Sequence, residues 1–233
     1  MHRLPRWIAP GLLFMLAATF AVPQEAKKYS IKTIAQPAPK EIAEPIAKLL
    51  SDQAVQLLDA AGKPICDVWF RKAIPADATA EQIKTGVTFR EVKQTEILGA
   101  IQLHVKWTDY RKQRLKPGVY TMRLAYQPTD GKHTADIAEF QDYAIFIDAK
   151  ADTKPILLDA QALSDKSGDS LELAHPAVFM LWPNYKPSKT PELAARPKNH
   201  WVVNASADLV VNGKSTGKLM GIGLTLVGHS PAE

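Results

Sequence analysis

Cysteine is almost absent from this sequence, because Cys66 is the only one in 233 residues. A single cysteine excludes a disulfide bond within the chain, so the folded state must be held together by its apolar core. Cys66 has no adjacent histidine and no partner in a Cys-x-x-Cys pattern. An isolated cysteine of this kind usually behaves as a small hydrophobic residue. We therefore expect Cys66 to be buried and unreactive.

Local motifs for metal binding and nucleophilic catalysis are also missing. The sequence has no His-x-His, His-Glu-x-x-His or Gly-x-Ser-x-Gly pattern, so it offers no template for a zinc ion or an activated serine. Asp130, His133 and Asp136 do crowd one turn and could hold a divalent cation, although aspartate is common in turns for backbone reasons alone. We expect no cofactor.

The chain also lacks a large net charge. It has 29 basic and 24 acidic side chains, which gives +5, and removal of Arg3 and Arg6 with the N-terminal segment would lower this to +3. Nucleic-acid binding needs a dense basic stripe. We therefore expect no nucleic-acid partner.

The N-terminal residues 1–21 have the three-part layout of a secretory signal peptide. A short basic start over 1–6 precedes an apolar run over 7–20, and Ala21 is a small residue at a plausible cleavage point. The run of about fifteen apolar residues is shorter than the roughly twenty that a membrane-spanning helix needs. The sequence predicts an exported protein, periplasmic or extracellular, without a membrane span after cleavage.

Residues 22–50 contain four prolines and favour extended backbone, with a short helix over 41–50 limited by Pro45. We expect this segment to lead into a single domain over 51–233. Apolar residues make up 46% of the chain, which is enough to bury a substantial core.

Short apolar or alternating stretches predict about eight strands within the domain. The stretches are 54–58, 65–70, 97–105, 119–126, 143–147, 178–182, 201–211 and 219–227. Thr79 and Gln82 have the spacing of a capping box for a second short helix, which Gly86 would end, and 164–170 resembles a hydrated loop. Such a pattern is typical of a sandwich or barrel of antiparallel strands. We predict a mainly β fold, an antiparallel β-sandwich of the Ig-like or prealbumin-like type, with one or two short helices.

Two pieces of the sequence resemble a known family of sandwiches. Residues 55–64, Val-Gln-Leu-Leu-Asp-Ala-Ala-Gly-Lys-Pro, resemble the first strand and turn of prealbumin-like modules, also called carboxypeptidase-regulatory-like. Residues 115–120, Leu-Lys-Pro-Gly-Val-Tyr, resemble the Pro-Gly-x-Tyr step into a later strand. The resemblance implies a sandwich that binds, spaces or braces other molecules. In such folds a tyrosine near a strand start often bonds backbone across the corner, so Tyr120 is expected in that role.

The connection over 183–198 has four prolines and no periodic apolar residues, so its sixteen residues form a candidate functional loop. Trp182 and Tyr185 enter it and Trp201 leaves it, and closure of the loop could bring the three rings together. Exposed aromatic faces stack on sugars or anchor a protein partner. The alternative is that these rings cover the edge of the core.

We favour a non-catalytic binding or accessory module whose partner is a protein or a glycan of the cell envelope. One alternative is an enzyme or metal-binding protein with a site assembled from dispersed residues. Another is a structural subunit of an envelope assembly that docks through residues 22–50.

The basic connection over 110–116 is a second candidate for ligand binding. Arg111 and Arg114 could hold a phosphate, a sulfated glycan or an acidic partner, or they could simply remain hydrated. If the connection binds anions, replacing both arginines with glutamate should lower retention on an anionic resin. Unchanged retention would end this hypothesis.

Overall fold

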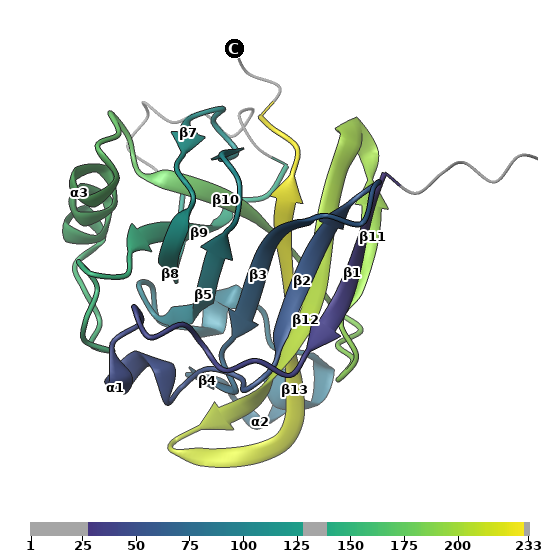
Figure 1. Ribbon diagram of the computed structural model, residues 1–233. Coiled ribbons are helices and arrows are strands. Elements are labelled where there is room, and N and C mark those ends of the chain that lie inside the picture. The colour runs from purple at the N-terminus through teal and green to yellow at the C-terminus, as the bar shows by residue number, and fades with distance from the viewer. Residues whose placement is uncertain (1–27, 128–138, 231–233) are drawn as a thin grey trace, which may run out of the picture.

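The computed structural model describes residues 28–127 and 139–230 (Figure 1). The expected signal peptide and the candidate ligands Asp130, His133 and Asp136 lie outside these residues. Within the described ranges, no helix has both the length and the apolar character to cross a membrane.

The elements in chain order are β1 (Tyr29–Ile34), α1 (Glu44–Ala47), β2 (Ala54–Asp59), β3 (Pro64–Phe70), β4 (Ala73–Ala76), α2 (Ala80–Thr85), the 3-10 helix η1 (Phe89–Glu91), β5 (Ile97–Leu103), β6 (Trp107–Thr108), β7 (Arg114–Leu115), β8 (Gly118–Tyr126), β9 (Asp142–Asp148), α3 (Ala160–Leu171), β10 (Ala177–Trp182), β11 (Glu192–Arg196), the 3-10 helix η3 (Pro197–Asn199), β12 (His200–Val211) and β13 (Lys214–Val227).

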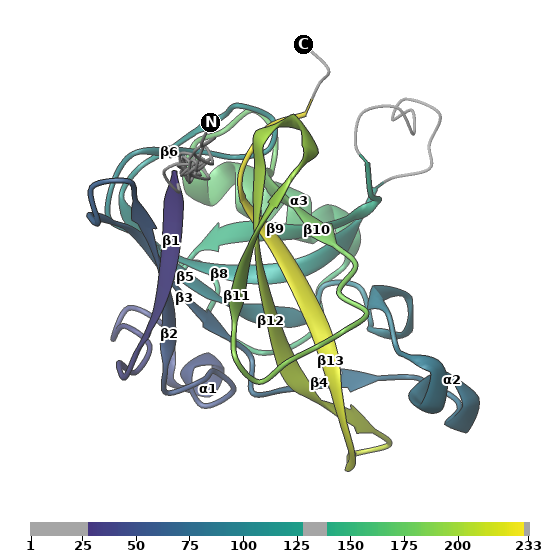
Figure 2. The ribbon, with the colours of Figure 1, turned by 90° about the vertical axis from the view of Figure 1, so that its right-hand side faces the viewer.

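One sheet contains most of the strands, and its hydrogen-bonded order is β1-β2-β3-β5-β8-β9-β10-β13-β12-β11, with β4 beside β12. Neighbours along this path are antiparallel, whereas β4 runs parallel to β12. The sheet curls into a half-barrel (Figure 2), because strand twist accumulates over many strands and long open sheets curl. The prediction of a mainly β fold is confirmed. The prediction of a sandwich is not confirmed, because the hydrogen-bonded path of strands continues through a single curled sheet.

The concave face of the sheet holds the main core. On β8, Tyr120 and Met122 belong to this core, as the alternation of the sequence predicts. Phe146 on β9 stacks on Phe179 on β10 at a ring-centroid distance of 4.0 Å. The Tyr120 hydroxyl donates to the Lys116 carbonyl at 2.5 Å, so the expected bond across the strand corner is confirmed.

Residues 28–50 cover part of the convex face. Strand β1 pairs with β2 along its whole length, and Ile46 and Leu50 are buried in a second apolar cluster with Trp69. The Trp69 indole nitrogen donates to the Gln36 carbonyl at 2.7 Å. Helix α1 is shorter than the expected 41–50 and has a proline in its first turn. This part of the chain is therefore built into the sheet and its outer cluster instead of extending away from them.

Helix α3 corrects the expectation of a hydrated loop over 164–170. Asp159 caps its start by accepting from the backbone N–H groups of Gln161 and Ala162, and Leu163 and Ser167 are buried. The Ser167 hydroxyl donates to the Phe146 carbonyl at 2.6 Å. Only two buried positions in twelve leave the helix with a mostly polar sequence, which conceals it from a search for apolar periodicity. The expected capping box of α2 is confirmed.

A buried arginine fastens a third covering segment to the convex face. Arg123, on β8, is 1% exposed, and its Nε and Nη2 atoms each donate to Asp152 at 2.8 Å. Its remaining donors reach the carbonyls of Thr95, Lys154 and Ile156 at 2.8–2.9 Å. This network satisfies the whole guanidinium and holds residues 152–156 against β8.

Replacing Arg123 with methionine should lower the free energy of unfolding by about 3–5 kcal/mol, because the Asp152 carboxylate would remain buried without its counter-ion. Denaturant titration measures the change. The double variant R123M/D152N should lose less than the sum of the two single variants. Lys116→Met is the control, since Lys116 and Glu172 form an exposed ion pair and such pairs contribute little. Equal midpoints for R123M and K116M would contradict the assigned role of Arg123.

Candidate binding site

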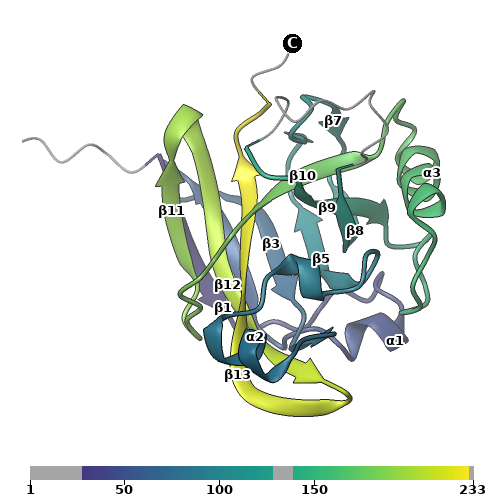
Figure 3. The same ribbon diagram turned by 180° about the vertical axis from the view of Figure 1, so that it is seen from behind.

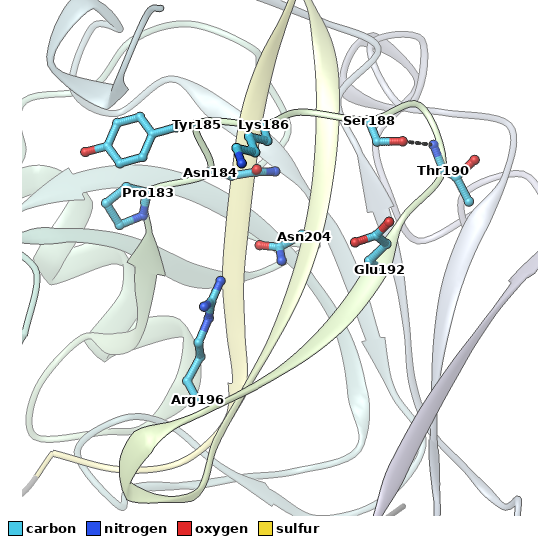
Figure 4. A pocket seen from close by; sticks show the side chains of 9 residues that line it. All are labelled: Pro183, Asn184, Tyr185, Lys186, Ser188, Thr190, Glu192, Arg196 and Asn204. Carbon is cyan, nitrogen blue, oxygen red and sulfur yellow. Dashed lines mark hydrogen bonds between the residues drawn. The ribbon is translucent and has the colours of Figure 1, made fainter.

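Two neighbouring clefts share the segment Pro183-Asn184-Tyr185, which lines both. The first, which we call the strand cleft, has a volume of about 310 Å³ (Figure 4). It is lined by Pro183, Asn184, Tyr185, Lys186, Ser188, Thr190, Glu192, Arg196 and Asn204. The second, which we call the turn cleft, has a volume of about 460 Å³. Its other lining residues are Val87, Thr88, Phe89, Arg90, Glu139, Phe140, Gln141, Asp142 and Gly221.

The segment after β10 crosses β13 and β12 before it enters β11 (Figure 3). Two glycines on β13 make this close crossing feasible. A Cβ atom at Gly221 would lie 2.1 Å from the Asn184 carbonyl oxygen, and one at Gly223 would lie 2.6 Å from the Trp182 carbonyl oxygen. The Asn184 side-chain amide also donates to the Ala205 carbonyl at 3.1 Å. The crossing segment is therefore held directly against the sheet.

The predicted sixteen-residue loop over 183–198 is partly a strand. Residues 192–196 form β11, which pairs with β12 from Glu192 opposite Asn204 to Arg196 opposite His200. Only the first part of the connection is irregular. The sequence of β11, Glu-Leu-Ala-Ala-Arg, has weak strand propensity. The hydrogen bonds to β12, and not the local sequence, therefore determine this strand.

Tyr185 is the most exposed large hydrophobic side chain in the part of the chain that the structure describes. It is 77% exposed, and Figure 4 shows its ring projecting away from Thr190 and Glu192. Because its segment lines both clefts, the ring stands at their boundary. An aromatic face in this position is free to stack on a bound molecule.

Trp182 and Trp201 do not join Tyr185 in an exposed platform. Trp182 is only 8% exposed and packs edge-on against Phe140, with a ring-centroid distance of 4.8 Å. The ring of Trp182 also lies near the ring of His200, the first residue of β12. Trp201 follows His200 directly, and consecutive side chains of a strand point to opposite faces. Trp201 therefore lies on the other face of β12, where it packs against Tyr29 at 5.4 Å.

Arg111 lies in the turn between β6 and β7, and Arg114 is the first residue of β7. Both are exposed, and neither lines the strand cleft or the turn cleft. The buried Asp109 carboxylate anchors this turn by accepting from the backbone N–H groups of Arg111, Gln113 and Val178. Burial raises the pKa of Asp109, and these hydrogen bonds act against the rise. Neither arginine therefore belongs to the cleft lining that includes Tyr185.

Each cleft contains both basic and acidic side chains, but they are arranged differently. In the turn cleft, Arg90 and Asp142 approach to 3.2 Å, and the guanidinium of Arg90 lies 4.8 Å from the Tyr126 ring centroid. Burial raises the pKa of Asp142, and the positive charge of Arg90 opposes this rise. In the strand cleft, Lys186 and Arg196 accompany a single acidic residue, Glu192.

The described residues contain no group of three histidine, cysteine or acidic side chains placed to hold a metal ion. Cys66 is buried, as expected. Burial and the negative charge of Asp67 raise the pKa of its thiol, so the reactive thiolate is strongly disfavoured.

Sequence reasoning identified Tyr185 but missed the polar residues around it, chiefly Asn184, Glu192, Arg196 and Asn204. The signal that could have found them is Gly221-Ile222-Gly223. Glycines inside a strand often mark a place where another backbone approaches closely, and here that backbone is the segment of Asn184.

Comparisons with models of protein families, with curated proteins and with solved structures found no match to this chain. The chemistry of the site must therefore be inferred from its own residues.

Replacing Gly221 with alanine should displace the crossing segment, because the new methyl group would overlap the Asn184 carbonyl. Overpacking of this kind costs about 1–3 kcal/mol of folding stability, and a soluble quencher should reach Trp182 more readily. Thermal unfolding and fluorescence quenching measure these two effects. Lys218→Ala, at an exposed position of the same strand, is the control. If G221A and K218A behave alike in both measurements, the glycines do not determine the position of the segment.

Proposed function

We propose that this protein is an exported, non-catalytic binding protein that holds a saccharide across the two clefts. The observation that carries the proposal is the exposed ring of Tyr185 at the boundary of two clefts lined with amide, hydroxyl and ionic side chains. The expected signal peptide of residues 1–21 supports export.

The lining residues suit a ligand rich in hydroxyl groups. In the strand cleft, Asn184 and Asn204 offer amide donors and acceptors, Ser188 offers a hydroxyl, and Glu192 offers a carboxylate acceptor. A sugar ring has polar edges for such groups and an apolar face for an aromatic ring. Most of the residues that line the strand cleft have polar or charged side chains, which distinguishes it from the mostly apolar pockets of many small-molecule sites.

The architecture is part of this proposal. We propose that the fold is related to prealbumin-like modules and serves to present a binding surface. The bond from the Tyr120 hydroxyl to the Lys116 carbonyl and the hairpin of β2 and β3 support this relation at the two places where the sequence resembles that family. A shared fold would not by itself identify a ligand.

Replacing Tyr185 with alanine should weaken saccharide binding by up to about tenfold, since an aromatic contact contributes about 0.5–1.5 kcal/mol. A printed array of neutral and acidic oligosaccharides would identify the ligand, and calorimetric titration would measure its affinity. Tyr185→Phe should retain most of the affinity because it keeps the ring.

The unfolding midpoint of Y185A should be unchanged, because the side chain is mostly exposed. Ile156→Ala, another exposed apolar position and one outside both clefts, should leave binding intact. If no oligosaccharide on the array binds the wild-type protein, the saccharide proposal fails.

A further inference from the structure

Arg196 has an unusual environment for an exposed arginine. It extends from β11 into the strand cleft (Figure 4), and its guanidinium carbon lies 5.3 Å from the centroid of the Trp182 ring. Trp182 is itself fixed between Phe140 and the sheet. Because Arg196 is already held against a fixed indole, its side chain has less conformational freedom to lose when a ligand binds.

The guanidinium of Arg196 is also without an acceptor. Over residues 28–127 and 139–230, no carboxylate or carbonyl lies within hydrogen-bond or ion-pair distance of it. Arg90 provides a contrast within the same region, because it also stacks on an aromatic ring but has Gln141 and Asp142 as partners at 3.3 and 3.2 Å. Arg196 therefore keeps its donors available to a molecule in the cleft.

Glu192 does not neutralise this donor group. Glu192 and Arg196 lie on the same face of β11, four residues apart, which corresponds to about 13 Å along a strand. Lys186 adds a second positive charge to the lining of the cleft. The cleft therefore has Arg196 on one side, Lys186 beside Asn184 on another, and a separate acceptor at Glu192 that remains free for hydroxyl groups (Figure 4).

We propose that the ligand of the strand cleft is an acidic saccharide whose carboxylate, sulfate or phosphate group is bound by the Arg196 guanidinium. This inference rests on the proposed saccharide-binding function. A planar guanidinium offers two parallel N–H donors that match the two oxygens of such a group. Stacking on Trp182 presents this fork in a fixed orientation, while Tyr185 contacts the sugar ring.

The test compares acidic oligosaccharides with neutral ones of the same ring structure, for example hexagalacturonate and its fully methyl-esterified form, within an array that also carries sulfated and phosphorylated sugars. The wild-type protein should bind at least one acidic sugar about ten- to a hundredfold more tightly than its neutral counterpart, the range expected for charge-assisted hydrogen bonds. Arg196→Gln should remove this preference, so that the acidic and neutral sugars bind the variant with affinities within about twofold of each other.

Arg196→Lys separates the geometry from the charge. It keeps the positive charge but loses the planar fork, so it should recover only a small part of the preference. Lys218→Gln makes the same change of net charge at an exposed position outside the lining of both clefts and should bind like the wild type. Unfolding midpoints of all the variants show whether each is folded.

The outcomes distinguish the two proposals. If neutral and acidic sugars bind equally, or if R196Q keeps the acidic preference, the inference about Arg196 fails while saccharide binding stands. If no sugar of either kind binds, both fail. If inorganic phosphate or sulfate binds at Arg196 while every sugar on the array does not, the cleft recognises the anion alone and the saccharide is excluded.

Discussion

A curled sheet of ten strands has two faces, and in this protein apolar and buried side chains lie on both of them. The concave face holds the main core, which also includes Phe89 and Val92 from the segment around η1. The convex face must be covered by other parts of the chain, and this requirement organises the rest of the structure. Residues 28–50 cover one region through Trp69, α3 covers another through Leu163, and Arg123 fixes the segment that contains Asp152 over a third.

The candidate site lies where a single irregular segment covers the sheet. Between β10 and β11, the chain crosses the sheet as a single irregular segment instead of a helix. Gly221 and Gly223 allow its backbone to lie directly against β13, which leaves a cleft on each side and Tyr185 exposed between them. The same arrangement places Trp182 beneath Arg196. A rigid sheet thus supports an exposed loop with a cleft on each side. Binding residues are often found on loops that a rigid scaffold holds in place.

Much of the β structure could be predicted from the sequence, because strands with alternating or compact apolar residues carry their own signal. Residues 119–126 predicted both β8 and its inward-facing side chains, and the turn at 59–64 predicted the hairpin of β2 and β3. Two elements could not be predicted in this way. Strand β11 depends on pairing with β12, and α3 has a mostly polar sequence whose position depends on burial of Leu163 and Ser167.

Residue type and near neighbours are enough to predict the mainly β character and the buried single cysteine. The corner bond of Tyr120 was predicted by the resemblance of residues 115–120 to prealbumin-like modules. The arrangement of the folded strands determines that they form one curled sheet, that Trp201 faces away from Trp182, and that Arg196 stacks above the indole. These last features join residues from different strands. Strand order and register set which side chains share a face, and periodicity along one segment carries no information about its neighbour.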